Sequence, residues 1–433
     1  MLGSVFKGFS YRFLPALAHS DYRKLWAAGI FAQASNWSLI VARAALALSI
    51  TGNAAAAGLV TFGAMIPILF VSPFAGYLAD RFDRKNVLIV GYLINVVQNW
   101  ILATLVLTGT IEFWHLALLA VVNGIARAIQ QPASSALLPN LVPKKILFNA
   151  IALQQATQQG GKGIGPLLIL PVILTGNENW AFVISAWLYV FALLMVMNIK
   201  TASRGIIQAK QSIFSGITEG LSFVYKVDAL RLIFLLVAFH CALTMAYETL
   251  FPIISRDQLG LGSAAGLYKG GAILMIAIGM GSLISSFTLA GMNSAVVRGR
   301  LYFTFGILSG ISPIFLGLSN NLTLAAIAAF GMGFSQAGFM TVSSVMIQQM
   351  VPDAIRGRAL AIYNWQMQGL MAGFNLINGV LVETALLTAM KVLSISGLIF
   401  NIIMGGSILS TPLRQIYREG QISCEQKTED CSQ

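Results

Sequence analysis

Long apolar segments recur along this chain of 433 residues, and each is long enough to cross a lipid bilayer. A helix needs about 20 mostly apolar residues to span the hydrocarbon core. Twelve segments satisfy this requirement, at 27–50, 55–79, 86–108, 114–136, 149–174, 180–199, 229–253, 264–289, 299–318, 322–348, 358–383 and 388–411. They predict an all-α membrane protein with twelve transmembrane helices.

The low content of charged residues supports this interpretation. Only 10% of the residues are charged and 57% are hydrophobic, whereas soluble domains average about 25% charged residues. The formal net charge of +12 also suits a nucleic-acid-binding protein, but most of the charges lie in short loops between apolar segments. There they fix topology and contact anionic lipid headgroups. The expected partner is therefore a lipid bilayer and not a nucleic acid.

Lysine and arginine residues orient the chain in the membrane. If the N-terminus is cytosolic, the inner segments hold twenty-one of these residues and the outer loops hold two, Arg256 and Lys391. Cytosolic loops retain positive charge. Both termini are therefore predicted to be cytoplasmic, in a protein of the plasma membrane, which in a bacterium is the inner membrane.

The two halves of the sequence resemble each other. SSALLPNLVPKKILFNAIAL at 134–153 aligns without gaps on SSVMIQQMVPDAIRGRALAI at 343–362, and seven of the twenty positions are identical. GLVTFG at 58–63 aligns with GLYKGG at 266–271, at nearly the same sequence offset as the first pair. Duplicated bundles of six helices are typical of transporters, which bind their substrate between the halves near the membrane midplane.

The repeat divides the chain into five expected parts. They are a cytosolic lead-in at 1–26, an N-terminal six-helix bundle at 27–199, a cytosolic linker with an amphipathic helix at 200–228, a C-terminal six-helix bundle at 229–411 and a cytosolic tail at 412–433. The three cysteines have no metal-ligand spacing and no even-numbered framework, so we expect neither a metal site nor a disulfide.

The loop between the second and third segments carries a family signature. GYLADRFDRK at 76–85 resembles the corresponding loop of the major facilitator superfamily, with matches at Gly76, Asp80, Arg81, Arg84 and Lys85. PASSALLPNLVPKKILFNAIAL, with VPDAIRGRALA later, resembles the bacterial subgroup that contains the enterobactin exporter. The resemblance covers essentially the whole chain. It implies two pseudo-symmetric six-helix bundles that rock around a central site.

This signature is expected to form a latch on the cytosolic side. Gly76 lets two helices approach closely, and Asp80 can accept hydrogen bonds from a helix N-terminus. The resemblance implies that this N-terminus lies near Gly357. Arg84 and Lys85 would pair with acids or carbonyls across the cytosolic face, and the latch must break in the inward-facing state. The alternative is that these charges only fix topology.

A second signature, in the fifth segment, resembles that of proton-driven exporters. GKGIGPLLIL supplies Gly161, Gly165 and Pro166 but has Ile169 and Leu170 where the family has glycines. This partial match favours export and leaves uptake open.

Polar side chains inside the apolar segments are functional candidates, because charges are costly to bury in a bilayer. Helical spacing arranges those of the first, fourth, seventh and tenth segments in stripes, and the resemblance implies that these four helices line the cavity. The candidates for substrate or coupling contacts are Gln33, Asn36, Arg43, Arg127, Lys162, His240, Tyr247, Glu248 and Gln336. For the amides, hydrogen bonds between helices are an equal alternative.

Glu248 is the only acid inside an expected segment apart from Glu383 at an outer border. Burial disfavours the charged form of a carboxyl group, which makes Glu248 the candidate for proton coupling. The alternative is a structural ion pair with Arg43 or Lys162. His240 is more often a helix contact than a proton carrier.

Several classes of protein are excluded. The sequence has no metal-ligand spacing, phosphate-binding loop or large soluble domain, which argues against an enzyme and against an ATP-driven pump. It predicts a monomeric secondary transporter that works by alternating access, uses a proton gradient and no cofactor, and exports a small amphiphilic compound. The excess of buried positive charge favours an anionic compound. A lysophospholipid or other lipid-like substrate, and an uptake carrier, are the alternatives.

Overall fold

The computed structural model describes residues 15–201, 221–290 and 295–420, apart from the side chains of some residues within the helices. The helices of the N-terminal half are α2 (Ser20–Thr51), α3 (Ala54–Arg81), α4 (Arg84–Leu107), α5 (Phe113–Leu137), α6 (Leu147–Leu174) and α7 (Trp180–Met197). Those of the C-terminal half are α9 (Asp228–Leu243), α10 (Leu250–Asp257), α11 (Ala264–Ala290), α12 (Ala295–Gly317), α13 (Leu322–Met350), α14 (Asp353–Glu383), α15 (Ala389–Gly406) and α16 (Thr411–Glu419).

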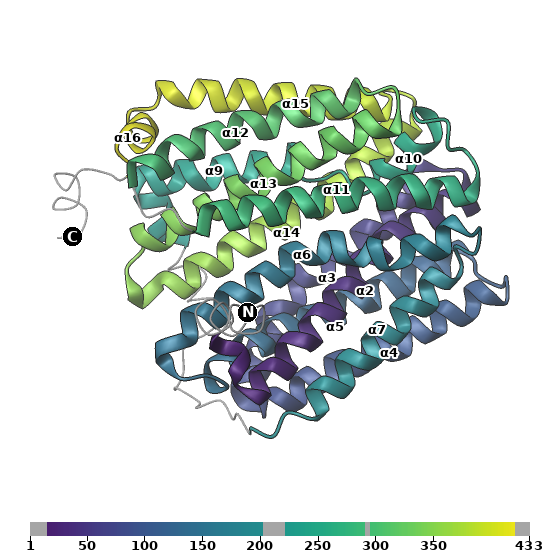
Figure 1. The fold of residues 1–433 in the computed structure, drawn as a ribbon. Coiled ribbons are helices and arrows are strands. Elements are labelled where there is room, and N and C mark those ends of the chain that lie inside the picture. Colours follow the sequence, from purple (N-terminus) through teal and green to yellow (C-terminus); the bar gives the residue numbers. More distant parts are fainter. Residues whose placement is uncertain (1–14, 202–220, 291–294, 421–433) are drawn as a thin grey trace, which may run out of the picture.

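The helices form two bundles that lie side by side (Figure 1). In the N-terminal bundle, α2 packs against α6 and α7, and α3 and α4 pack against α5. In the C-terminal bundle, α11 and α12 pack against α13, and α12 also packs against α15. The predicted all-α fold with two related six-helix bundles is confirmed.

One glycine pair shows how closely the two bundles correspond. Gly124 in α5 and Gly333 in α13 are 209 residues apart, the offset that aligns the repeat. A Cβ atom on Gly124 would lie 2.8 Å from the carbonyl oxygen of Ala64 in α3. One on Gly333 would collide with the carbonyl oxygen of Ile278 in α11. Both contacts need a residue without a side chain, so that the two helix backbones can touch.

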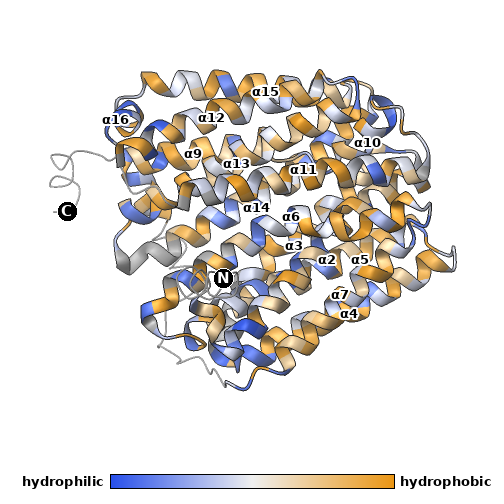
Figure 2. Ribbon diagram, in the orientation of Figure 1, coloured by the Kyte–Doolittle hydropathy of each residue, from blue (hydrophilic) through white to orange (hydrophobic). Residues whose placement is uncertain are grey.

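The helices present apolar side chains to their surroundings. Within the described part of the chain, nine helices are long and apolar enough to cross a membrane. Figure 2 shows hydrophobic residues along their lengths, and Phe70, Phe315 and Ile327 are each more than 60% exposed, at 64%, 62% and 64%. Three expected spans remain. Two are α6 and α14, which carry polar stretches, and the third is divided between the short helices α9 and α10.

The seventh expected segment, 229–253, is not one helix. α9 ends at Leu243, residues 244–249 are not helical, and α10 begins at Leu250. These six residues contain no proline or glycine, so no local signal in the sequence predicts the break. Side chains of the neighbouring helices stabilise it, as described below.

The start of the C-terminal tail is folded. Leu413, Ile416 and Tyr417 of α16 are buried, and the Tyr417 hydroxyl lies 2.6 Å from Ser407 Oγ. The end of the tail lies outside the described residues, as do most of the expected linker helix and the beginning of the lead-in. The last residues of the expected lead-in, from Ser20 on, are continuous with the first span.

Candidate functional site

Close contacts between helices join the two bundles. α3 packs against α14, α6 packs against α11, and α2 contacts both α10 and α11. A Cβ atom on Gly58 in α3 would lie 3.0 Å from the backbone oxygen of Asn375 in α14. One on Gly163 in α6 would lie 3.2 Å from the Cα atom of Gly279 in α11. Small residues therefore allow the bundles to touch backbone to backbone.

Hydrogen bonds close one end of this interface, where α2 ends and α3 begins. The first and last described residues lie at the opposite end of the bundles (Figure 1). The Ala54 amide at the start of α3 donates to Glu383 Oε2 over 2.7 Å. Arg256 Nη1 donates to the Gly52 carbonyl over 3.3 Å. We call the set the distal seam; it consists of Gly52, Ala54 and Gly58 of one bundle and Arg256, Asn375 and Glu383 of the other.

A cavity of about 200 Å³ lies between the bundles. Its lining reaches Leu25, Ser134 and Gln154, which lie near the ends of α2, α5 and α6 on the side of the chain termini. We call this side proximal. The cavity therefore extends toward the proximal side, whereas the distal side is held shut by the distal seam.

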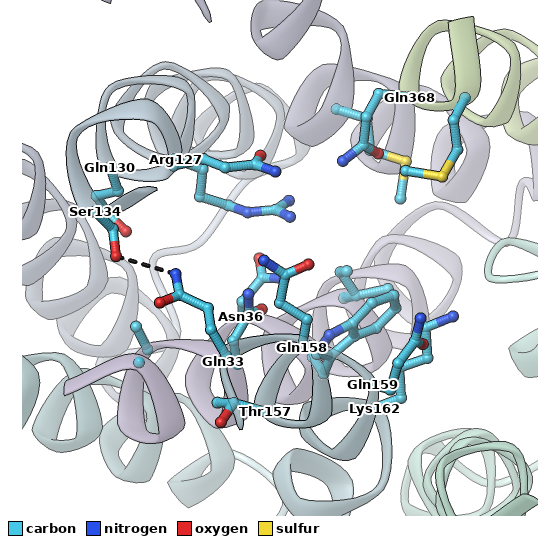
Figure 3. Close-up of a pocket in the computed structure, with 18 of the residues that line it drawn as sticks. Gln33, Asn36, Arg127, Gln130, Ser134, Thr157, Gln158, Gln159, Lys162 and Gln368 are labelled. Atoms are coloured by element: carbon cyan, nitrogen blue, oxygen red, sulfur yellow. Dashed lines mark hydrogen bonds between the residues drawn. The ribbon is translucent and has the colours of Figure 1, made fainter. Parts of the chain in front are cut away.

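The N-terminal bundle supplies a polar wall to the cavity. It consists of Gln33, Asn36, Arg127, Gln130, Gln131, Ser134, Gln154, Thr157, Gln158, Gln159 and Lys162. These side chains come from α2, α5 and α6, where they recur at helical spacing on the faces that meet (Figure 3). Among the residues that line the cavity, Arg127 and Lys162 carry charge and both are cations.

Several groups of the polar wall have no hydrogen-bond partner among the described residues. They are Nη1 of Arg127 and both polar atoms of the Asn36 amide, all of which are buried. Lys162 Nζ lies 5.2 Å from the centre of the Trp37 ring, a cation–π contact. A buried polar group without a partner costs about 1–3 kcal/mol. Arg127 and Asn36 can recover this cost by binding a ligand.

The C-terminal bundle supplies a different surface, which we call the methionine wall. It consists of Met245, Met340, Met367 and Met371, with Gln368 among them. Methionine is flexible and polarisable, so it adapts to apolar ligands of varied shape. The sequence analysis missed this surface, because a methionine within an apolar segment carries no distinguishing pattern.

Arg43 does not line the cavity, contrary to expectation. It is 3% exposed, and its Nη2 donates to Gln98 Oε1 in α4 over 3.0 Å. Gln98 contacts Asn95, which accepts a hydrogen bond of 2.8 Å from Asn123. The steps from Gln33 to Arg43 turn the side chain by about 80° around an ideal helix. The expected stripe therefore faces the cavity at Gln33 and Asn36 and leaves it at Arg43.

His240, Tyr247 and Gln336 also lie outside the cavity lining. His240 is fully buried, its Nε2 lies 2.7 Å from Ser309 Oγ, and its ring stacks on Phe339 at 4.4 Å. The Tyr247 ring stacks on Phe251. These are contacts within the C-terminal bundle.

Gln336 belongs instead to a set of amides that hold the break between α9 and α10. Its Nε2 donates to the Thr244 carbonyl over 2.7 Å, and Asn378 Nδ2 donates to the Ala246 carbonyl over 2.7 Å. Asn375 Oδ1 accepts from the Thr249 amide over 3.1 Å. Non-helical backbone at membrane depth is tolerated only where protein groups satisfy it. Asn375 and Asn378 were not among the expected site residues.

Glu248 lies within this break. It is 3% exposed, and its Oε2 accepts from Asn375 Nδ2 over 2.8 Å. Its Oε1 is buried and has no hydrogen-bond partner among the residues that the structure describes. It faces a small pocket with Ile40 and Pro252, separate from the main cavity. Lys162 is within electrostatic range. The carboxyl group is thus held between the bundles but does not line the main cavity.

The expected cytosolic latch is described in part. Gly76 and Asp80 lie at the end of α3, and Gly357 lies in the first turns of α14. The contacts of these three residues are not among those that the structure describes. Arg84 Nη1 donates to the Ala136 carbonyl over 3.1 Å, and Lys85 Nζ donates to the Ile199 carbonyl over 2.5 Å.

The hydrogen bonds described for Arg84 and Lys85 thus go to carbonyls of their own bundle. Their pairing across the cytosolic face stays a prediction. Arg81 is exposed. Asp83, which was not singled out in the sequence, caps α4 by accepting from the Lys85 amide over 2.9 Å.

The exporter-like motif of α6 lies against α2. A Cβ atom on Gly161 would lie 2.8 Å from Gln33 Cβ, and one on Gly165 would collide with the Ala34 carbonyl oxygen. Pro166 follows within the same helix. The motif thus brings α6 close to α2, so that the polar faces of both helices meet in the polar wall.

Comparisons with known proteins agree with this architecture. A family model described as "Transmembrane secretion effector" (MFS_3) matches residues 12–429. The staphyloferrin A transporter of Staphylococcus aureus is 24% identical over 312 residues, which are 72% of this chain and 77% of that protein. The multidrug efflux pump Tap of Mycolicibacterium fortuitum is 25% identical over 355 residues, 77% of this chain and 82% of that protein.

Solved structures of transporters share the fold. The nucleoside transporter NupG superposes with a TM-score of 0.68 at 15% identity, over 93% of this chain and 100% of that one. A D-xylose-proton symporter superposes with a TM-score of 0.70 at 14% identity, over 88% and 96%. Since the family model spans nearly the whole sequence, the chain belongs to the transmembrane secretion effector family of the major facilitator superfamily, and it is a membrane transporter and not an enzyme.

Proposed function

We propose that the protein is a secondary active transporter that works by alternating access and exports small amphiphilic compounds in exchange for protons. It acts as a monomer with both termini in the cytoplasm. The observation that carries the proposal is a central cavity that extends to the proximal side while the distal seam closes the other side. A site open to one side at a time is what alternating access requires.

Three further features support export of such compounds. Relatives carry the names multidrug efflux pump and macrolide efflux protein. The cavity combines a polar wall with the methionine wall, which suits an amphiphile. Glu248 supplies an embedded carboxyl group between the bundles for the proton, held by Asn375 and within electrostatic range of Lys162.

A transport screen in everted membrane vesicles tests this function. Siderophores, drugs and lysolipids are offered from outside, with the vesicle interior either acidic or equilibrated. We expect accumulation of an amphiphile with an acidic interior and its loss when a protonophore is added. Transport that ignores the pH gradient contradicts the coupling, and accumulation only in right-side-out vesicles identifies an uptake carrier.

Counterflow separates a carrier from a channel. Proteoliposomes loaded with unlabelled substrate are diluted into a trace of labelled substrate. A carrier accumulates the label transiently, because one site is exposed alternately to the two sides. A channel gives no such overshoot, and that result would remove alternating access from the proposal.

A further inference from the structure

The charge around Arg127 is not balanced in the described part of the chain. Arg127 lies within electrostatic range of a second buried cation, Arg43, and of the Tyr189 side chain. Arg43 is hydrogen-bonded to an uncharged amide, Gln98. Glu248, the acid that lies between the bundles, borders a different pocket. A positive potential in a site of low dielectric attracts an anion and repels a cation.

The other cation of the cavity is already engaged. Lys162 lies over the Trp37 ring and within electrostatic range of Glu248. Arg127 therefore differs from Lys162, because it has a buried N–H donor with no partner in the described part of the chain. A guanidinium presents its donors in a planar fork that matches a carboxylate.

Asn36 completes a group of unpaired donors. Asn36 is 3% exposed, and it lines the same cavity as Arg127. Both polar atoms of its amide lack partners within residues 15–201, 221–290 and 295–420. Figure 3 shows Arg127 projecting into the cavity toward the side on which Asn36, Gln33 and Gln158 lie. Amide N–H groups add hydrogen bonds to a bound anion, and the surrounding glutamines provide more of them.

The methionine wall faces this cluster from the other bundle. Met340, Met367 and Met371 line the cavity from α13 and α14. A ligand that touches both walls must be charged at one end and apolar at the other. Such a ligand also contacts both bundles, which is required of a substrate that moves with their rocking.

We propose that the cavity binds amphiphiles with one carboxylate, which Arg127 and Asn36 hold while the methionine wall holds the apolar body. This assignment deepens the proposed function, on which it rests, by naming the substrate class. The polar wall sets the preference for charge. The methionine wall sets affinity for the apolar body and has no preference for charge.

Three matched probes separate these contributions. They are 4-butylbenzoate, 4-butylbenzamide and 4-butylbenzylammonium, which share an apolar body and differ in charge. Binding to the purified full-length protein is measured without a gradient, through the fluorescence of tryptophans such as Trp26 and Trp37 that line the cavity. We expect the benzoate to bind about tenfold more tightly than the benzamide, as for a charge-assisted hydrogen bond, and the ammonium to bind weakest.

Variants assign the preference to residues. Arg127→Gln should remove the preference for benzoate over benzamide and leave benzamide affinity unchanged. Asn36→Leu, which provides a second test if Arg127→Gln fails to fold, should reduce the same preference. Met367→Ser should weaken all three probes alike. The matched control is Arg231→Gln, because Arg231 is 43% exposed and pairs with Asp228 outside the cavity.

Equal binding of the three probes, tighter binding of the amide or ammonium, or an unchanged preference in both Arg127→Gln and Asn36→Leu would overturn the assignment. Because the measurement needs no gradient, its outcome is independent of whether transport is driven by protons. If the protein binds benzoate selectively but its transport does not respond to the pH gradient, the proposed substrate class stands and the proposed proton coupling is wrong.

Discussion

Glu248 offers a test of coupling at a single side chain. In Glu248→Gln the side-chain oxygen can still accept from Asn375 Nδ2, so the hydrogen bond is kept while the titratable group is lost. We expect transport in vesicles to lose its response to the pH gradient, while counterflow, which needs no proton step, continues. The measurement compares the initial rates of both assays in the parent and the variant.

Lys391→Gln is a suitable control, since Lys391 lies in the first turn of α15 and is exposed. It should leave both rates unchanged. If Glu248→Gln keeps its full response to the gradient, Glu248 has only the structural role of holding the break through Asn375.

The sequence predicted which polar residues lie within the helices better than it predicted the neighbours toward which their side chains point. Arg43 and Arg127 were both expected in the cavity, but only Arg127 lines it. Along α2, residues spaced by three, four and three positions do not stay on one face of the helix. The side chain of Arg43 therefore points toward α4, where it binds Gln98. Which neighbour lies beside a given face depends on the packing of all helices, and no local pattern contains that information.

At the scale of the element, the spans could be predicted and their interruption could not. The bounds of α3, α4 and α11 agree with the apolar segments to within a few residues, because hydropathy and length determine whether a segment can cross a bilayer. The break at 244–249 depends on amides of α13 and α14 that are 92 and 132 residues away in sequence from the carbonyls they bind. It is therefore a property of tertiary packing.

The break itself yields a prediction about stability. In Asn378→Ala the carbonyl of Ala246 loses the 2.7 Å hydrogen bond that satisfies it. A buried acceptor left without a partner costs about 1–3 kcal/mol, so the variant should denature at a lower temperature than the parent. Thermal unfolding in detergent, followed by circular dichroism or tryptophan fluorescence, measures the shift.

Asn198→Ala is the matched control for this experiment. Asn198 is exposed, and its Nδ2 donates to the Leu194 carbonyl of its own helix end. Water can replace that bond, so the control should denature close to the parent temperature. Equal denaturation temperatures for parent, Asn378→Ala and Asn198→Ala would contradict the stabilising role of the amide.

At the scale of the whole molecule, α3 and α14 connect both ends of the interface. Their distal ends meet at Ala54 and Glu383, and their proximal ends carry Asp80 and Gly357, the residues of the expected latch. Rigid helices that touch at one end separate at the other when the bundles rock. The sequence predicted the two bundles but not which side is closed, because one sequence must support both conformations at similar free energy.

A bulky residue in the distal seam should therefore shift the molecule toward its other conformation. In Gly58→Leu the new side chain would meet the backbone of α14, since even a Cβ atom lies 3.0 Å from the Asn375 oxygen and 3.2 Å from Leu376 Cα. Backbone atoms cannot move aside as a flexible side chain can. We expect the distal side to open and the proximal side to close.

Labelling of a single cysteine measures this shift. Ile40→Cys, in a protein without its native cysteines, lies between the cavity and the small pocket beside Glu248. A membrane-impermeant maleimide added on the distal side should react about tenfold faster when Gly58→Leu is present, as for a shift of about 1.4 kcal/mol between two states. Gly405→Leu is the control, because a Cβ atom on Gly405 meets nothing within 4 Å. An unchanged distal rate in Gly58→Leu would mean that the distal seam does not govern access to the cavity.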